Sequence, residues 1–255
     1  MKILAIGDVI GAPGRNYLKD NLQYIKNEFG IDFVIANGEN SSGGLGMNPK
    51  AFSELINAGV DAITLGNHTW RKKDILKVID DSRVIRPINY LEGTRGRGFR
   101  FFNVNDKKIL VINALGRVYL DPVSNPFLAV RNAVNEMSGK ADIIIVDFHA
   151  EATSEKKAMG YLLDGKVNLV FGTHTHVQTG DEDILPKGTA YITDIGMTGP
   201  KESIIGADKS IIITSFLTEI PEKRELATGE VELNAVMIDV DDATNKTVSI
   251  TRIRK

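Results

Sequence analysis

The sequence predicts an α/β protein in which two mixed β-sheets pack face to face with helices on the outside. Short runs rich in β-branched residues alternate with amphipathic stretches, which indicates strands joined by right-handed helical crossovers. Two further segments each contain two strand-like runs joined by a turn, which indicates hairpins in a second sheet or antiparallel strands beside the first. The 255 residues supply one substantial core, so we expect residues 1–255 to form a single domain.

Five apolar runs predict strands that are buried on both faces. They are KILAIGD (2–8), DFVIANGEN (32–40), DAITLGNH (61–68), DIIIVDFHAE (142–151) and NLVFGTHTH (168–176). Each run ends in a small polar cluster. Ligands of open α/β sheets bind beyond the carboxyl ends of the strands, so these clusters are the expected functional site.

Four segments predict helices that separate these strands. They lie at 14–30, 48–59, 125–139 and 153–165. Gly30 is the expected C-terminal stop of the first helix. Asn48 and Asn125, each followed by proline, are the expected N-caps of the second and third. We expect Thr153 or Ser154 to cap the fourth.

The two predicted hairpins lie in the middle and at the end of the chain. Residues 97–115 indicate a strand, a turn at Asn105-Asp106 and a second strand. Residues 232–254 indicate another pair of strands that turns near Asn245.

The composition limits the kinds of function. A net charge of −2 argues against a large nucleic-acid-binding face. The absence of cysteine excludes disulfides, thiolate metal sites and thiol nucleophiles, so any metal must be held by nitrogen and oxygen ligands. The short apolar run at the N-terminus does not resemble a signal peptide, and no segment approaches the roughly 18–20 apolar residues of a membrane span. We therefore expect a cytoplasmic protein with no membrane partner.

Side chains that bind metals follow all five predicted strands. They are Asp8, Glu39 with Asn40, Asn67 with His68, His149, and His174 with His176, and they include all four histidines of the chain. His174 and His176 are alternate residues at a strand end, so their side chains face the same way. Such a pair suits either a polar rim or metal ligation. The gathering of every histidine at strand ends favours metal ligation.

The order of these clusters resembles that of the calcineurin-like metallophosphoesterases, whose pattern is D-x-H, G-D-x-x-[DN], G-N-H-[DE], H and G-H-x-H. The blocks GDVIGAPGR, ANGENSSGG, LGNHTW, DFHAEATSEK and GTHTHVQTGDEDILPKGTAYITDIGMTGP are similar to those of one bacterial family, the 2′,3′-cyclic-nucleotide 2′-phosphodiesterases. The similarity extends over nearly the whole chain.

The chain departs from the general superfamily pattern at several positions. Ile10 stands where the first motif has a histidine, and Glu39 stands where the bridging residue is an aspartate. Thr69 follows Gly-Asn-His in place of an acid, and Thr173 displaces the first histidine of the last motif. The bacterial family shares these departures, which strengthens the resemblance to it and leaves the identity of the metal open.

The resemblance implies two metal ions per chain. Asp8, Glu39, Asn40 and His176 would hold one ion, and Glu39, Asn67, His149 and His174 would hold the other. Glu39 would thus bridge them. The resemblance implies iron, with manganese or zinc as alternatives that suit imidazole, amide and carboxylate ligands. His68 would either protonate the leaving oxygen or orient a metal ligand.

The implied function is hydrolysis of 2′,3′-cyclic nucleotides, and of other cyclic nucleotides or phosphodiesters, to nucleoside 3′-phosphates. The implied mechanism is attack by a metal-bridging hydroxide with His68 as proton donor. The alternatives are a phosphomonoesterase or phosphoprotein phosphatase on the same centre, and a metal-binding regulatory protein. The expected partner is a small nucleotide or phosphodiester, with RNA-derived substrates and a homo-oligomer left open. Apart from the proposed metal ligands and His68, the sequence does not indicate which residues bind substrate.

Overall fold

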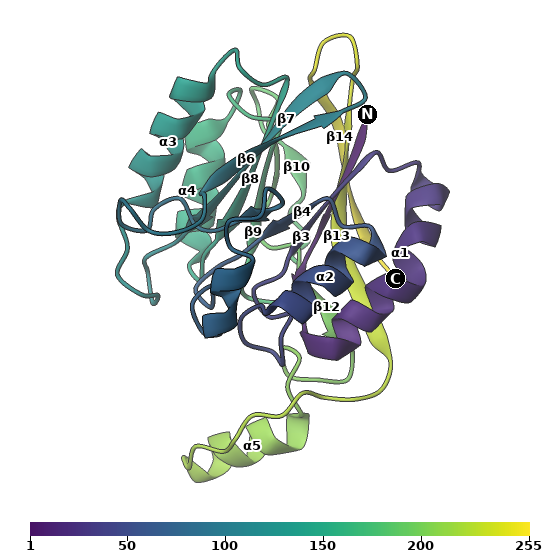
Figure 1. The fold of residues 1–255 in the computed structure, drawn as a ribbon, viewed down its shortest axis with the longest axis vertical. Coiled ribbons are helices and arrows are strands. Elements are labelled where there is room, and N and C mark those ends of the chain that lie inside the picture. The colour runs from purple at the N-terminus through teal and green to yellow at the C-terminus, as the bar shows by residue number, and fades with distance from the viewer.

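The computed structural model describes residues 1–255. Two mixed β-sheets pack face to face, and helices cover the outer face of each sheet (Figure 1). The fold class predicted from the sequence is confirmed. One sheet has eight strands in the order β2-β12-β13-β1-β3-β4-β5, with β14 paired to β13. The other has six strands in the order β10-β11-β9-β8-β7-β6.

The eight-stranded sheet combines the N-terminal βα strands with the C-terminal hairpin. Its strands are β1 (Lys2–Ile6), β2 (Asp8–Val9), β3 (Phe33–Asn37), β4 (Ala62–Thr64), β5 (Val84–Ile85), β12 (Met197–Pro200), β13 (Val231–Val240) and β14 (Thr247–Arg254). Strands β1, β3, β4 and β5 are parallel, whereas β13 runs antiparallel to β1 with Ala5 opposite Val236. The hairpin expected near Asn245 is confirmed, and it completes this sheet.

The six-stranded sheet is parallel at its centre and antiparallel at its edges. Its strands are β6 (Phe99–Val104), β7 (Lys107–Leu115), β8 (Ile143–His149), β9 (Leu169–Thr173), β10 (Asp183–Ile184) and β11 (Ala190–Ile192). The predicted turn between β6 and β7 is confirmed, since Asn105 and Asp106 have φ angles of 45° and 61°. Two successive left-handed residues are what a tight hairpin turn of this hand needs.

The alternation of side chains along each strand builds three apolar layers. On β1, Ile3 and Ala5 face the other sheet, where they join a buried cluster of 18 residues drawn from both sheets. Leu4 and Ile6 face the opposite way and pack under the helices. The strands are therefore buried on both faces, as their unbroken apolar sequences indicate.

Each sheet is covered by one pair of helices. They are α1 (Gly11–Phe29) and α2 (Pro49–Ala58) on the eight-stranded sheet, and α3 (Pro126–Met137) and α4 (Thr153–Leu163) on the six-stranded sheet. A short 3₁₀ helix, η1 (Lys73–Lys77), follows β4. Gly30, with φ 67°, ends α1 as expected. Asn48 and Asn125 accept hydrogen bonds from amides in the first turns of α2 and α3, so both predicted caps are confirmed.

The expected cap of α4 by Thr153 or Ser154 is wrong. The N-cap is Ala152, whose carbonyl oxygen accepts from the Lys156 amide at 3.2 Å, so Thr153 is already the first helical residue. Ala152 has the extended backbone of a cap residue, φ −79° and ψ 123°, and no side chain caps the helix.

Residues 201–230 form an arm between β12 and β13, with α5 (Lys209–Thr218) at its far end (Figure 1). The Lys201 amide donates to the Glu230 carbonyl oxygen at 2.9 Å and closes the base of the arm. No residue of α5 is buried. The sequence analysis did not anticipate this helix, because its apolar residues surround the axis and form no helical stripe.

None of the helices has both the length and the apolar character that a membrane crossing requires.

Candidate metal centre

The predicted site residues gather at one edge of the two sheets. Asp8 opens β2, Glu39 and Asn40 follow β3, and Asn67 and His68 follow β4 in the eight-stranded sheet; His149 ends β8, and His174 and His176 follow β9 in the six-stranded sheet. Contacts of 3.8 Å or less link all of them into one cluster. The fold therefore brings together every residue that the sequence analysis singled out for this site.

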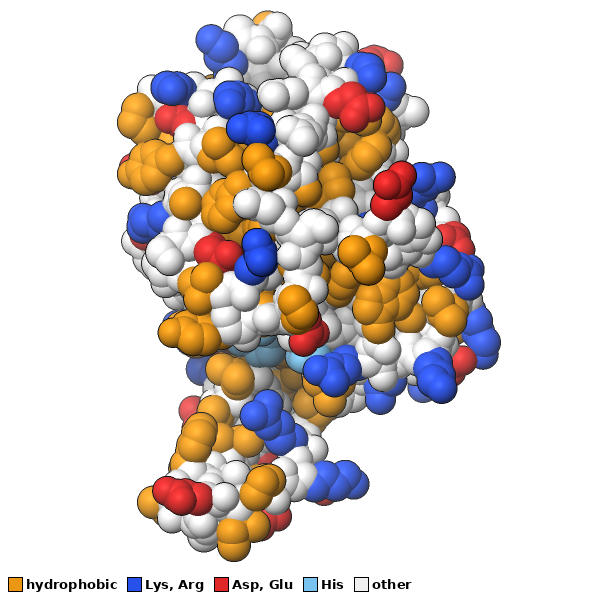
Figure 2. Space-filling view, turned by 90° about the vertical axis from the view of Figure 1, so that its left-hand side faces the viewer, with side chains coloured by type: hydrophobic (Ala, Val, Ile, Leu, Met, Phe, Trp, Pro, Cys, Tyr) orange, Lys and Arg blue, Asp and Glu red, His pale blue; other side chains and the backbone are white.

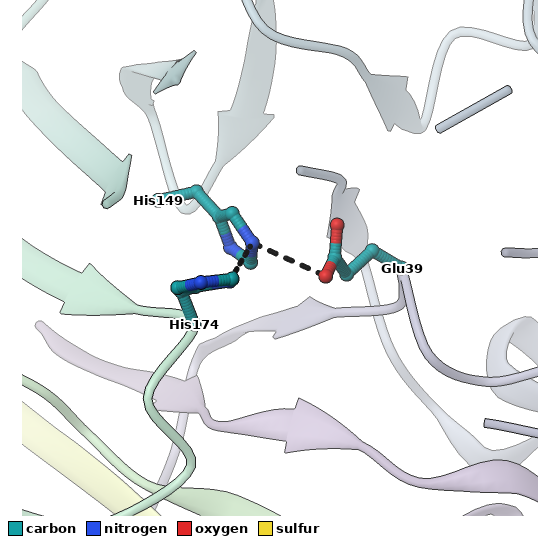
Figure 3. Close-up of side chains that lie close together, drawn as sticks. All are labelled: Glu39, His149 and His174. Carbon is teal, nitrogen blue, oxygen red and sulfur yellow. Dashed lines mark hydrogen bonds and ion pairs between the residues drawn. The ribbon is translucent and has the colours of Figure 1, made fainter. Parts of the chain in front are cut away.

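One part of the cluster converges on a single nitrogen, His149 Nε2. Asn67 Oδ1 lies 3.0 Å from it, and Glu39 Oε1 and His174 Nδ1 each lie 3.1 Å from it (Figure 3). An imidazole nitrogen carries at most one proton, so hydrogen bonding satisfies only one of these three neighbours. Several lone pairs directed at one point are the arrangement that a cation stabilises.

The other part of the cluster surrounds His176 Nε2. The Asn40 amide nitrogen lies 3.0 Å from it, and Asp8 Oδ1 lies 3.8 Å from it. Asp8 is fully buried, and its Oδ1 has no hydrogen-bond partner. A buried carboxylate oxygen without a partner is costly, and a metal ion bound there removes that cost. Asn40 also contacts Glu39 Oε1 at 3.4 Å and so connects the two parts.

A hydrogen-bond relay fixes the orientation of His149. Its Nδ1 lies 2.8 Å from Thr173 Oγ1, and this hydroxyl donates to Asp147 Oδ1 at 2.7 Å. Because the Thr173 hydroxyl donates its only proton to Asp147, it can only accept from His149, so His149 Nδ1 is the donor. The remaining nitrogen, Nε2, then presents its lone pair to the centre. A metal-ligating histidine is oriented in this way by the partner of its other ring nitrogen.

The other two histidines of the ring are oriented in the same manner. His174 Nε2 pairs with Glu151 Oε2 at 3.0 Å, which turns the Nδ1 lone pair inward. His176 Nδ1 donates to the Ile205 carbonyl oxygen at 3.0 Å, which turns the Nε2 lone pair inward. Every proposed imidazole ligand thus has its proton held on the outer side, and the donor set fits a cation.

His68 is arranged differently. Its Nδ1 lies 2.8 Å from Asn40 Oδ1 and 3.1 Å from Glu39 Oε1, both of which are acceptors. The inner nitrogen of His68 therefore carries a proton and offers no lone pair to the centre. Its backbone amide donates to Glu39 Oε2 at 2.9 Å, which helps to hold the Glu39 carboxylate in place.

The electrostatics of the protein atoms call for positive charge at this centre. Burial opposes a charge on His149, but the carboxylates of Glu39 and Asp8 outweigh it and raise the pKa of His149 to about 9. Burial and repulsion by His149 lower the pKa of His174 to about 3. Burial also opposes the charge on Glu39, yet His149 and His68 hold the pKa of Glu39 well below its usual value. Glu39 is therefore ionised, and a proton or a metal cation must balance it.

Several supporting residues were not singled out from the sequence. Asp147 and Glu151 orient His149 and His174, and Asp194 binds the loop that carries His174 and His176. Asp147 stands two residues before His149 on the same strand, so the shared face of alternate residues was an available signal. Glu151 and Asp194 lie in loops, where sequence spacing indicates nothing about side-chain direction.

The centre opens beside the arm. Figure 2 shows histidine side chains in the notch between the main body and the arm. The side chains of His68, His174 and His176 keep 21%, 17% and 11% of their surface exposed, whereas that of Glu39 is fully buried. A small molecule therefore reaches the imidazoles from the notch, with the carboxylate behind them.

Comparison with known proteins identifies the family. The model of the family described as YmdB-like protein matches residues 4–253. The chain belongs to the YmdB-like family. This YmdB-like chain is 49% identical to the 2′,3′-cyclic-nucleotide 2′-phosphodiesterase of Bacillus subtilis (strain 168), with 99% of this chain and 96% of that protein covered. The family resemblance read from the sequence motifs is confirmed.

Two solved structures are similar to this YmdB-like chain along its whole length. A hypothetical protein from Thermus thermophilus matches with a TM-score of 0.95 and 40% identity, covering 100% of this chain and 99% of that one. A structure described as a novel phosphatase of Mycoplasma pneumoniae matches with a TM-score of 0.94 and 40% identity, covering 100% of this chain and 93% of that one.

Proposed function

We propose that this YmdB-like protein is a metal-dependent phosphodiesterase that hydrolyses 2′,3′-cyclic nucleotides to nucleoside 3′-phosphates. The activity for which the Bacillus subtilis relative is named supports the substrate class. The observation that carries the proposal is the inward direction of the lone pairs of His149, His174 and His176 beside the unpartnered Asp8 Oδ1.

We propose two metal ions per chain, iron by preference, with manganese or zinc able to replace it. Asp8, Glu39, Asn40 and His176 would hold one, and Glu39, Asn67, His149 and His174 would hold the other. The contacts of Glu39 support its role as the shared ligand, since Oε1 lies 3.1 Å from His149 Nε2 and 3.4 Å from Asn40 Nδ2. Bound metal ions would supply Lewis-acid stabilisation of the charge on the phosphate oxygens.

His68 is the proposed proton donor to the leaving oxygen. Hydrolysis forms a bond between water oxygen and phosphorus and breaks the bond between phosphorus and O2′, whose electron pair then takes a proton. His68 Nδ1 is engaged by Asn40 and Glu39, whereas no protein atom is hydrogen-bonded to Nε2, and the side chain is 21% exposed. With Nδ1 already protonated, only the imidazolium form of His68 carries a proton on Nε2 as well, and in that form Nε2 can donate to O2′ of a substrate in the notch. The product is the 3′-phosphate.

The product mixture tests this proposal. We expect purified protein with its metals to open 2′,3′-cyclic AMP, and chromatography to find one dominant product, the 3′-phosphate. Adenosine 3′-phosphate and other monoesters serve as competing substrates in the same assay. Faster hydrolysis of monoesters would favour a phosphomonoesterase, the activity suggested by the description of the Mycoplasma pneumoniae structure. A mixture rich in the 2′-phosphate would contradict proton donation to O2′.

A further inference from the structure

A groove with a volume of about 470 Å³ starts at His176. It runs along the ends of β13 and β14 to the base of the arm, and its polar wall includes Lys201, Glu232, Arg252 and Arg254. Pockets of about 300–1,000 Å³ accommodate small-molecule ligands, so this groove has room for one further nucleotide beside the metal centre. His176 is shared between the two regions, since its Nε2 faces Asp8 and its Nδ1 contacts Ile205 in the groove wall.

The two arginines of the groove are held with their charges outward. Arg254 Nε and Nη2 donate to Glu232 Oε2 at 2.9 and 2.7 Å, and the exposed fractions of the two side chains are 66% and 16%. Arg252 Nε lies 2.7 Å from Glu182 Oε2, and the corresponding fractions are 42% and 22%. In each pair the glutamate is the less exposed partner. Hydrogen bonds hold Arg254 on Glu232, whereas Arg252 and Glu182 form an ion pair without a hydrogen bond. The Nη1 groups remain available to an incoming anion.

The arrangement of these cations suits a chain of phosphates. Arg252 and Arg254 are alternate residues of β14, so their side chains lie on the same face about 7 Å apart. Lys201 adds a third cation from the base of the arm, whereas Glu232 is the only acidic side chain in the wall. Three of the four charged side chains that line the groove are thus cationic, and each is paired with one carboxylate, Lys201 with Glu230 at 3.5 Å. A phosphate can share these cations with their glutamates.

The chemistry of the proposed substrate indicates what would occupy this groove. In a 2′,3′-cyclic phosphate, the O2′ and O3′ atoms of the ribose are both bonded to the same phosphorus. Further nucleotides are therefore linked only through O5′. A mononucleotide leaves the groove empty, whereas an RNA strand that ends in a cyclic phosphate has a phosphodiester and a second nucleotide to place in it.

We propose that this groove binds the nucleotide on the 5′ side of a terminal 2′,3′-cyclic phosphate, and that the preferred substrate is a short RNA with that ending. The inference rests on the proposed function, because it assumes that the metal centre opens the cyclic phosphate. The bond that breaks is the same one, between phosphorus and O2′. The arginines and Lys201 contribute binding of the preceding phosphate and take no part in the bond cleavage.

The test compares 2′,3′-cyclic AMP with the dinucleotide ApA that ends in a 2′,3′-cyclic phosphate, on the metal-loaded protein. We expect kcat/KM for the dinucleotide to exceed that for the mononucleotide by about tenfold, the scale of one charge-assisted phosphate contact, with most of the difference in KM. Raising the ionic strength should reduce this ratio. The double variant Arg252→Gln/Arg254→Gln should bring the ratio close to one.

The matched control removes two exposed cations elsewhere, Arg131→Gln/Lys140→Gln, and it should keep the wild-type ratio. Circular dichroism checks that both double variants are folded. A wild-type ratio near one, with the mononucleotide hydrolysed, would overturn this inference and leave the proposed function standing. An unchanged ratio in the arginine variant would also overturn it. If the protein hydrolysed neither substrate, both proposals would be overturned.

Discussion

Lys156 and Asp194 form an ion pair with 2.6 Å between Nζ and Oδ2, and both side chains are buried. The same Asp194 oxygen accepts from the amide of Thr175 at 3.1 Å and from its hydroxyl at 2.8 Å. The other oxygen accepts from the Gly196 amide, and the Gly196 carbonyl oxygen accepts from the Asp8 amide at 3.0 Å. One carboxylate therefore positions both the loop between the paired histidines and the backbone at Asp8.

Replacing Lys156 by methionine should weaken both the fold and the metal centre. The change leaves the Asp194 carboxylate buried without a counter-charge, which costs about 3–5 kcal/mol. Chemical denaturation measures that loss, and isothermal titration of the apoprotein with Mn²⁺ measures the metal affinity. The control is Lys157→Met, which removes a half-exposed ion pair to Asp181 and should cost about 1 kcal/mol or less. Equal losses in the two variants would contradict the positioning role of Lys156.

Gly66 allows the closest approach of backbone to the centre. A Cβ atom at this position would overlap Glu39 Oε2 and His149 Nε2. Gly66→Ala should therefore displace these two side chains and greatly reduce metal content, as measured by elemental analysis. Gly180→Ala is the control, because its Cβ would meet only the Arg252 guanidinium at 3.6 Å, an ordinary contact. A Gly66→Ala protein that binds metals like the wild type would show that the Glu39 and His149 positions are not needed.

The central strands, the capped helices and the ring of site residues could be predicted from the sequence because their causes are local. Unbroken apolar runs indicate buried strands, and an asparagine before proline indicates a helix start, as Asn48 and Asn125 show. The strand ends then placed the ring, since parallel strands bring their carboxyl ends to one edge of a sheet.

The remaining features depend on contacts between distant segments. Asp194 pairs with Lys156 across 38 positions, and nothing in the local sequence of either residue indicates the partner. The pairing of β13 with β1 could not be predicted either, because strand propensity does not indicate which strand of a sheet a late strand pairs with. The arm helix α5 could not be predicted because its apolar residues form no helical stripe and the β-branched residues in IIITS favour a strand, whereas the chain there forms a helix with no buried residue.

Glu39→Ala should lose both metal ions, because Glu39 is the only ligand proposed to serve both. We expect elemental analysis of freshly purified wild-type protein to give close to two metal ions per chain, and the variant to give close to none. Chelation should abolish wild-type turnover in the same preparation. Glu92→Ala removes an exposed acid and should keep both ions. One tightly bound metal ion in the Glu39 variant would contradict the bridging assignment.

Asp181 should contribute to stability in a pH-dependent way. Burial opposes its charge, but hydrogen bonds from Thr193, Thr179 and Lys157 lower its pKa to about 2. The unfolded value is about 3.9, so the contribution is present above pH 4 and is lost as the pH falls toward 2. We expect Asp181→Asn to be less stable than wild type at pH 7, with the difference shrinking below pH 4.

Denaturant unfolding at a series of pH values checks the Asp181 prediction. Asp183→Asn, an exposed neighbour, should follow the wild-type profile throughout. A stability difference for Asp181→Asn that stays constant from pH 7 to pH 3 would show that its charge is not stabilised by folding.

The role proposed for His68 makes its importance depend on the leaving group. Proton donation matters when the departing oxygen is a basic ribose alkoxide, and it matters little when the departing group is a stable nitrophenolate. His68→Ala should therefore lower kcat on 2′,3′-cyclic AMP by about 10²–10⁴-fold but lower it by far less on bis(p-nitrophenyl) phosphate, with the metal content unchanged. A residue that only orients a metal ligand would reduce both rates by the same factor, because both substrates use the same centre. Equal losses on the two substrates, or loss of metal in the variant, would contradict proton donation by His68. His68 would then serve to hold Glu39 and Asn40, which its Nδ1 contacts at 3.1 and 2.8 Å.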